Sequence, residues 1–100
     1  MKDLKTEISD AMKTGKILIG AKSVGGALLN SNPKLVLVSS NCPNNVGEEI
    51  IYYSRLSNVP YKMLPNDSLE LGSMCGRPFP VSTLGIIDEG ESGILDMIKG

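Results

Sequence analysis

The chain contains no histidine, and this absence limits the chemistry it can perform. Without an imidazole there is no histidine general base, no Ser-His-Asp triad and no histidine ligand for a metal ion. Most hydrolase and metalloenzyme mechanisms therefore lack a component. We expect a protein that is not an enzyme, with no catalytic residues, no bound metal and no cofactor.

Cysteine is scarce, since only Cys42 and Cys75 occur and no CxxC pair is present. Two isolated thiols predict neither a zinc site nor a disulfide framework, so we expect both to be free and reduced. Cys42 precedes Pro43, where a helix is expected to begin, and helix N-termini favour the reactive thiolate. No neighbouring base accompanies it, which argues against catalysis there.

Long hydrophobic runs are also missing. The N-terminus lacks the apolar stretch of a signal peptide, and the longest apolar runs, such as residues 35–38, are far shorter than a membrane span. We therefore expect a cytoplasmic protein with no membrane partner.

The chain has no surplus of positive charge, because 10 basic and 11 acidic residues give a formal net charge of -1. That total does not by itself indicate nucleic-acid binding. The charge is unevenly distributed, however. Residues 11–47 carry four lysines and no acid, a sum of +4, and residues 71–87 carry only Arg77, a sum of +1. If loops from these two segments converge, they form a modest basic face. The four lysines are Lys13, Lys16, Lys22 and Lys34.

A length of 100 residues with 41% hydrophobic content predicts one domain over residues 1–100. Helical and strand-like patterns alternate along it, in an order that predicts an α/β fold with helices on both faces of a sheet. Gly25 and Gly26 weaken the second helix by about 1 kcal/mol each relative to alanine, which predicts a surface that something approaches closely. The expected helices span about residues 4–14, 22–30, 43–58, 68–75 and 91–98, and the expected strands span 16–19, 35–38, 61–64 and 81–87.

The first candidate loop, residues 20–26, follows a strand and opens a helix. It does not match a P-loop, because Gly25 is followed by Gly26 and Ala27 where the motif needs Lys and then Ser or Thr. Backbone N–H groups at a helix N-terminus, together with Lys22 and Ser23, still suit a single phosphate or a nucleic-acid backbone. A plain strand-to-helix turn with a solvated lysine explains the segment equally well on its own.

Two further loops carry polar or aromatic groups. Residues 39–45 follow the apolar strand of residues 35–38, and Asn41 there either reads a base edge or, with its neighbours, caps the next helix. Residues 76–81 hold the only phenylalanine, Phe79, between two prolines and near Arg77. That ring is either a core anchor or an exposed platform for stacking a base.

An ordered series of motifs across the chain resembles the thirty-e family of archaeal and eukaryotic large-subunit ribosomal proteins, within the kink-turn RNA-binding superfamily. The resemblance implies a three-layer α/β/α sandwich with a mixed four-stranded sheet, in which the last strand is antiparallel to the first two. The motifs are Thr14-Gly15-Lys16-Ile17, Gly20-Ala21-Lys22-Ser23, Ser40-Asn41-Cys42-Pro43, Tyr52-Tyr53-Ser54-Arg55-Leu56-Ser57, Glu70-Leu71-Gly72, Gly76-Arg77-Pro78-Phe79-Pro80-Val81-Ser82 and Asp88-Glu89-Gly90-Glu91-Ser92.

The resemblance also implies the roles of individual residues. Gly20 allows close approach of the RNA backbone, Lys22 pairs with a phosphate and Asn41 contacts a base. Phe79 stacks on an exposed nucleotide, and Arg77 occupies a basic position of the family. The complete expected RNA-binding set is Gly20, Lys22, Ser23, Asn41, Arg77, Phe79 and Val81.

We therefore expect a structural constituent of the large ribosomal subunit that binds and stabilises kink-turn ribosomal RNA. Its partners would be that RNA and neighbouring ribosomal proteins, and off the ribosome it would be a monomer. Three alternatives remain open. They are a non-ribosomal kink-turn protein acting in RNA processing or autoregulation, a small phosphate-ligand-binding α/β domain that uses Cys42 if it is an enzyme, and a protein adaptor anchored by Tyr52 or Tyr53.

Overall fold

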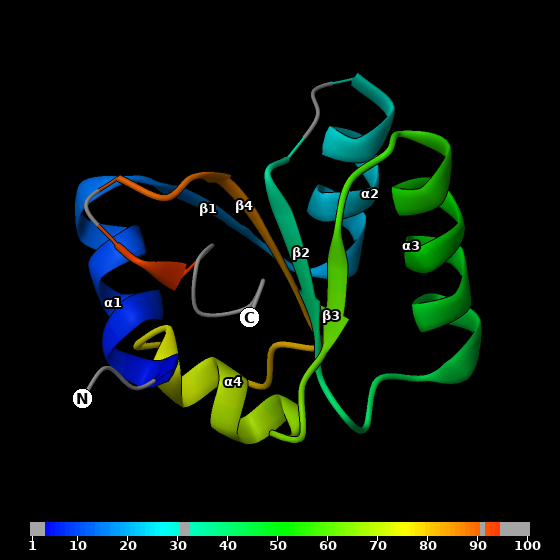
Figure 1. Ribbon diagram of the computed structural model, residues 1–100. Coiled ribbons are helices and arrows are strands. Elements are labelled where there is room, and N and C mark those ends of the chain that lie inside the picture. The colour runs from blue at the N-terminus through cyan, green and yellow to red at the C-terminus, as the bar shows by residue number, and fades with distance from the viewer. Residues whose placement is uncertain (1–3, 31–32, 91, 95–100) are drawn as a thin grey trace.

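The computed structural model describes residues 4–30, 33–90 and 92–94 (Figure 1). Helices and strands alternate along most of the chain, as the sequence pattern predicts. The helices are α1 (Leu4–Thr14), α2 (Ala21–Asn30), α3 (Asn44–Leu56) and α4 (Ser68–Met74), and the strands are β1 (Lys16–Ile19), β2 (Leu35–Val38), β3 (Tyr61–Met63) and β4 (Thr83–Asp88).

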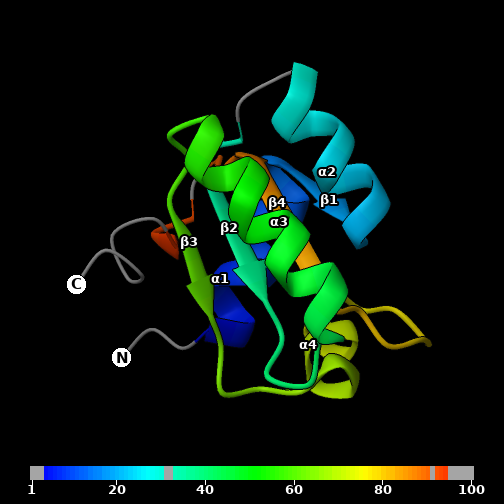
Figure 2. The same cartoon turned by 90° about the vertical axis from the view of Figure 1, so that its right-hand side faces the viewer.

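The four strands form one mixed sheet in the order β1-β4-β2-β3. Strand β4 is antiparallel to both β1 and β2, whereas β2 and β3 are parallel. Helices α2 and α3 cover one face of the sheet, and α1 and α4 cover the other (Figures 1 and 2). The predicted three-layer arrangement is therefore confirmed, including the reversed direction of the last strand.

The core is divided by the sheet into two clusters of buried side chains. All four residues of β2 are buried, because successive side chains of a strand point to opposite faces and both faces are covered. Leu35 and Leu37 pack with α1 and α4, and Val36 and Val38 pack with α2 and α3. A continuous apolar run is thus what a central strand of this fold requires.

Both ends of α4 are closed by local interactions. At the start, the Asp67 side chain accepts a hydrogen bond of 2.8 Å from the backbone N–H of Glu70, as expected of an N-cap residue. At the end, Gly76 has φ +71°, and the N–H groups of Gly76 and Arg77 donate to the carbonyls of Ser73 and Gly72. This Schellman motif satisfies carbonyls that would otherwise lack partners.

Some element limits differ from the sequence-based expectation. Strand β4 begins at Thr83 instead of Val81, because the Val81 N–H donates to the carbonyl of Ser68 in α4 and not to a neighbouring strand. Helix α3 ends at Leu56, just before Asn58 adopts a left-handed φ of 57°. The expected helix over residues 91–98 lies largely outside the described residues.

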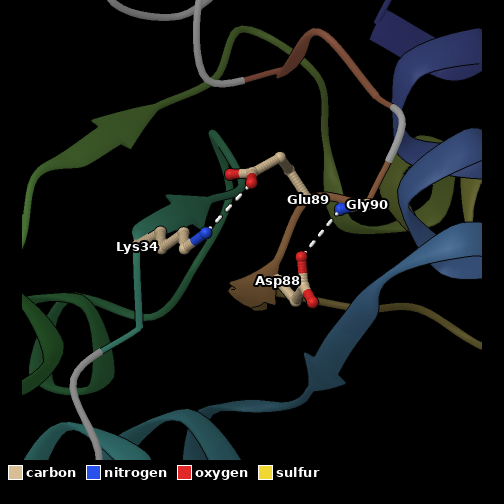
Figure 3. A network of polar contacts seen from close by, with 4 residues as sticks. All are labelled: Lys34, Asp88, Glu89 and Gly90. Atoms are coloured by element: carbon tan, nitrogen blue, oxygen red, sulfur yellow. Dashed lines mark hydrogen bonds and ion pairs between the residues drawn. The ribbon is translucent and has the colours of Figure 1, made fainter.

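The edge of the sheet where β2 begins and β4 ends carries charged contacts (Figure 3). The Lys34 ammonium lies 3.0 Å from Oε1 of Glu89, and this partner raises the pKa of Lys34. The Asp88 carboxylate accepts a hydrogen bond of 2.9 Å from the Gly90 N–H. Lys34 is therefore engaged at the opposite edge of the sheet from the three candidate loops.

Candidate nucleic-acid interface

The three candidate loops meet at one edge of the sheet. Strands β1 and β2 end there, and the antiparallel β4 begins there, so the topology brings distant segments together. The Gly20 N–H donates to the Thr83 carbonyl at 2.9 Å, and the Ser39 N–H donates to the Ser82 carbonyl at 2.8 Å. These bonds hold the first two loops against the residues that follow the third.

The first loop leads into α2 through Gly20, which has φ +99°. No atom lies within 4 Å of a Cβ placed at this position, so the backbone conformation and not lack of space favours glycine. Glycine offers no side chain to cap the helix, which leaves the first N–H groups of α2 available to an anion. Lys22 and Ser23 lie exposed in this first turn, and the turn contains no acidic residue.

The second loop presents Asn41, whose side chain does not cap α3. The N-cap of that helix is Pro43, and no side chain caps it. Instead, Oδ1 of Asn41 accepts a hydrogen bond of 2.8 Å from the Ser68 N–H, and Nδ2 donates to Oγ of Ser68 at 3.2 Å. Since an amide group has two N–H donors and two acceptor lone pairs, one of each remains free on this exposed side chain.

The third loop exposes its aromatic residue, since Phe79 is 51% exposed. The alternative of a core anchor is therefore wrong for this side chain. Arg77 is also exposed, whereas Val81 is only 2% exposed and packs in the core on the α1 and α4 side. The Val81 N–H donates to the Ser68 carbonyl, so any contact of Val81 with RNA would have to use the Val81 carbonyl.

The cationic side chains are less concentrated at this edge than the sequence arithmetic suggested. Lys16 opens β1 and Lys34 precedes β2, so both lie where these strands begin, away from the loops. Only Lys22 and Arg77 belong to the converging loops. Lys22 lines a groove of about 230 Å³ between α2 and α3, where Glu49 adds an acidic group. The interface is therefore only weakly basic.

Neither cysteine provides evidence for catalysis. Both are free, and burial raises the pKa of the Cys75 thiol to about 11 although the nearby Arg77 lowers it. A thiol with that pKa remains protonated near neutral pH and is a poor nucleophile.

In residues 4–30, 33–90 and 92–94, no group of three potential metal-ligating side chains occurs. Within the same ranges no helix is long and apolar enough to cross a membrane.

Two residues of α4 contact the loops although the expected RNA-binding set does not include them. Ser68 contacts both the second and the third loop through the hydrogen bonds described above. A Cβ at Gly72 would overlap the carbonyl oxygen of Phe79, so glycine allows the third loop to lie directly against the helix. The contacts of Ser68 are long-range, and no local sequence signal indicates which loops pack on α4.

Known proteins resemble this chain over nearly its full length. The model of the Ribosomal protein L7Ae/L30e/S12e/Gadd45 family matches residues 2–96. A "Large ribosomal subunit protein eL30" of Saccharolobus solfataricus is 41% identical over 93 residues, which cover 93% of this chain and 86% of that protein. Proteins of the same name from Pyrobaculum islandicum and Methanopyrus kandleri are 38% and 35% identical, each over 99% of this chain and over 98% and 91% of their own lengths.

A solved structure, described as "The structure of a protein with unknown function from Bacillus halodurans C", shares the fold with a TM-score of 0.80. It covers 94% of this chain and 93% of its own at 22% sequence identity.

The curated relatives are named as ribosomal proteins, which are structural proteins and not enzymes, and this confirms the prediction that the chain is not an enzyme. The match to residues 2–96, together with relatives at 35–41% identity, establishes that the chain belongs to the ribosomal protein L7Ae/L30e/S12e/Gadd45 family.

Proposed function

We propose that this protein is a constituent of the large ribosomal subunit that binds a kink-turn, a sharply bent internal loop, in ribosomal RNA. The observation that carries the proposal is the meeting of the α2 N-terminus, the Asn41 amide and the exposed Phe79 ring at one edge of the sheet. The names of the eL30 relatives support the assignment to the large ribosomal subunit. Ribosome association in the cytoplasm follows from that assignment.

The proposed mechanism is recognition of RNA shape. A kink brings phosphates close together at an electrostatic cost, and a protein that binds only the bent form shifts the population by its differential affinity. Lys22, Arg77 and the uncapped N-terminus of α2 reduce that cost where the strands approach. Because these positive groups are few, affinity depends on the shape of the RNA more than on phosphate density.

The base-contacting groups give the second part of the mechanism. Phe79 offers a ring face for stacking, and RNA bases splayed out of a bent loop are free to stack on it. Asn41 keeps one donor and one acceptor free beside each other, which suits the edge of a base. Stacking on Phe79 requires an unstacked nucleotide, which a continuous duplex does not provide.

The proposal is tested by titrating the protein with a kink-turn RNA and with a straight duplex of matched length at the same salt concentration. We expect clearly tighter binding to the kink-turn. Equal affinity for the two RNAs would contradict shape recognition. Co-sedimentation with large ribosomal subunits then separates a ribosomal constituent from a kink-turn protein that acts in RNA processing or autoregulation.

Contacts with neighbouring ribosomal proteins form a further part of the proposal. Leu29, Tyr52 and Leu56 are 60–65% exposed and lie in the second halves of α2 and α3, away from the three loops. Exposed apolar side chains of this kind suit protein contacts. Off the ribosome we expect a monomer, to be checked by sedimentation equilibrium.

A small-ligand domain is the weaker candidate. Such a site needs a concave pocket with converging polar groups. One groove, of about 360 Å³, is lined mainly by residues of α1 and α4 and lies away from the first two loops. The groove of about 230 Å³ at Lys22 places the acidic Glu49 beside that lysine, which does not favour an anionic ligand. If the protein were an enzyme that uses Cys42, the Cys42→Ser substitution would abolish its enzymatic activity. In the proposed RNA-binding protein, the same substitution should leave the RNA affinity nearly unchanged.

A further inference from the structure

One residue of α4 joins the loop that carries Asn41 to the loop that carries Phe79. Ser68 is the first residue of this helix. Its N–H donates to Oδ1 of Asn41 at 2.8 Å, and its Oγ accepts from Nδ2 of Asn41 at 3.2 Å. Its carbonyl accepts from the N–H of Val81 at 2.9 Å. The three bonds use three different atoms of Ser68, so they form at the same time.

The position of Ser68 is itself fixed by contacts that do not involve Asn41. Asp67 caps the start of α4, and the Ser40 N–H donates to the Asn66 carbonyl at 2.9 Å. The Schellman motif closes the other end of the helix, and Gly72 allows the backbone at Phe79 to pack against its side. Ser68 is therefore a fixed reference point between the two loops.

The two bonds to Asn41 also determine which way its amide group faces. The Ser68 N–H can only donate, so it selects the amide oxygen, and the hydroxyl oxygen accepts from the amide nitrogen. A side chain held in one orientation loses less conformational freedom when it binds a partner. The free donor and acceptor of Asn41 consequently point in a defined direction before RNA arrives.

We propose that Ser68 is a positioning residue of the RNA interface, which orients the Asn41 amide and fixes its placement relative to the Phe79 loop. The inference rests on the proposed function and adds to it a residue that need not touch RNA. It assigns α4 a role in the interface, although this helix contributes no residue to the expected RNA-binding set.

The test compares kink-turn affinities of four proteins. Ser68→Ala removes the hydroxyl and keeps the backbone bonds, so we expect binding about three- to tenfold weaker with little change in thermal stability. Ser68→Thr restores the hydroxyl and the affinity. Ser73→Ala is the matched control, because it makes the same change at an exposed serine of the same helix and should bind like the wild type.

A double variant separates positioning from a general structural role. If Ser68 acts through Asn41, then Ser68→Ala has no further effect on affinity once Asn41→Ala has removed the amide. Additive losses, or wild-type affinity of Ser68→Ala, would overturn the inference and leave the proposed function standing. If the wild type and Ser73→Ala both bind the kink-turn no more tightly than the straight duplex, the proposed function fails and the inference fails with it.

Discussion

Replacing Phe79 by alanine is the most direct test of base stacking by the third loop. The Phe79 residue is 51% exposed, so much of its surface is accessible to a nucleotide. Removing an aromatic platform of this kind costs about 1–3 kcal/mol per stacked base, which corresponds to roughly 5- to 150-fold weaker binding. Because about half of the residue's surface is covered, we expect the lower half of that range, about 5- to 30-fold.

The same substitution should have little effect on folding. Phe79 lies outside the two buried clusters, so we expect the free energy of unfolding to fall by about 1 kcal/mol or less, near the range for exposed positions. Fluorescence anisotropy with a labelled kink-turn RNA measures affinity, and urea denaturation measures stability. Leu29→Ala is the matched control, since Leu29 is 65% exposed but lies at the C-terminal end of α2. The candidate interface lies at the N-terminal end of that helix. A Phe79→Ala protein that binds within twofold of the wild type would refute stacking at this loop.

Four further predictions concern charge and packing. Kink-turn affinity should depend weakly on salt, with a log–log slope of about -2 to -4 for two to four phosphate contacts, and a slope near -8 in the titration would reveal a larger basic surface. Lys22→Ala should weaken binding whereas Lys34→Ala should not, because Lys34 lies at the opposite edge of the sheet; equal losses for the two variants would contradict this placement. Burial raises the pKa of Cys75 to about 11 from the 9.0 of an exposed thiol, so the unfolded state releases its proton first and stability should fall by about 1–3 kcal/mol between pH 9 and pH 11. Urea denaturation across this range should show a shallower fall for Cys75→Ala, and identical profiles would count against the burial effect. Gly26→Ala should raise the free energy of unfolding by about 0.5–1 kcal/mol, because alanine favours the helix and no atom lies within 4 Å of the added Cβ. A loss of RNA affinity in the same variant would show that RNA approaches this face of α2.

Much of the secondary structure follows from local sequence patterns. The limits of β1 and β2 match the predicted strands, because short apolar segments bounded by turn residues have few other stable conformations. The start of α4 is equally local, since Asp67 caps a backbone N–H only three residues away. Val81 departs from the predicted strand because its hydrogen bond runs to Ser68, a long-range contact that no local pattern specifies.

The candidate site divides in the same way. The sequence by itself identified the three loops and the residue types suited to RNA, and the family resemblance implied that the last strand runs opposite to the first two. Only the tertiary structure decided that Phe79 is exposed, that Asn41 bonds to Ser68 instead of capping α3, and that Lys34 pairs with Glu89 away from the loops. The reason is physical: helix caps and strand limits depend on neighbours within a few residues, whereas exposure and polar pairing depend on which distant segments the packed sheet brings together.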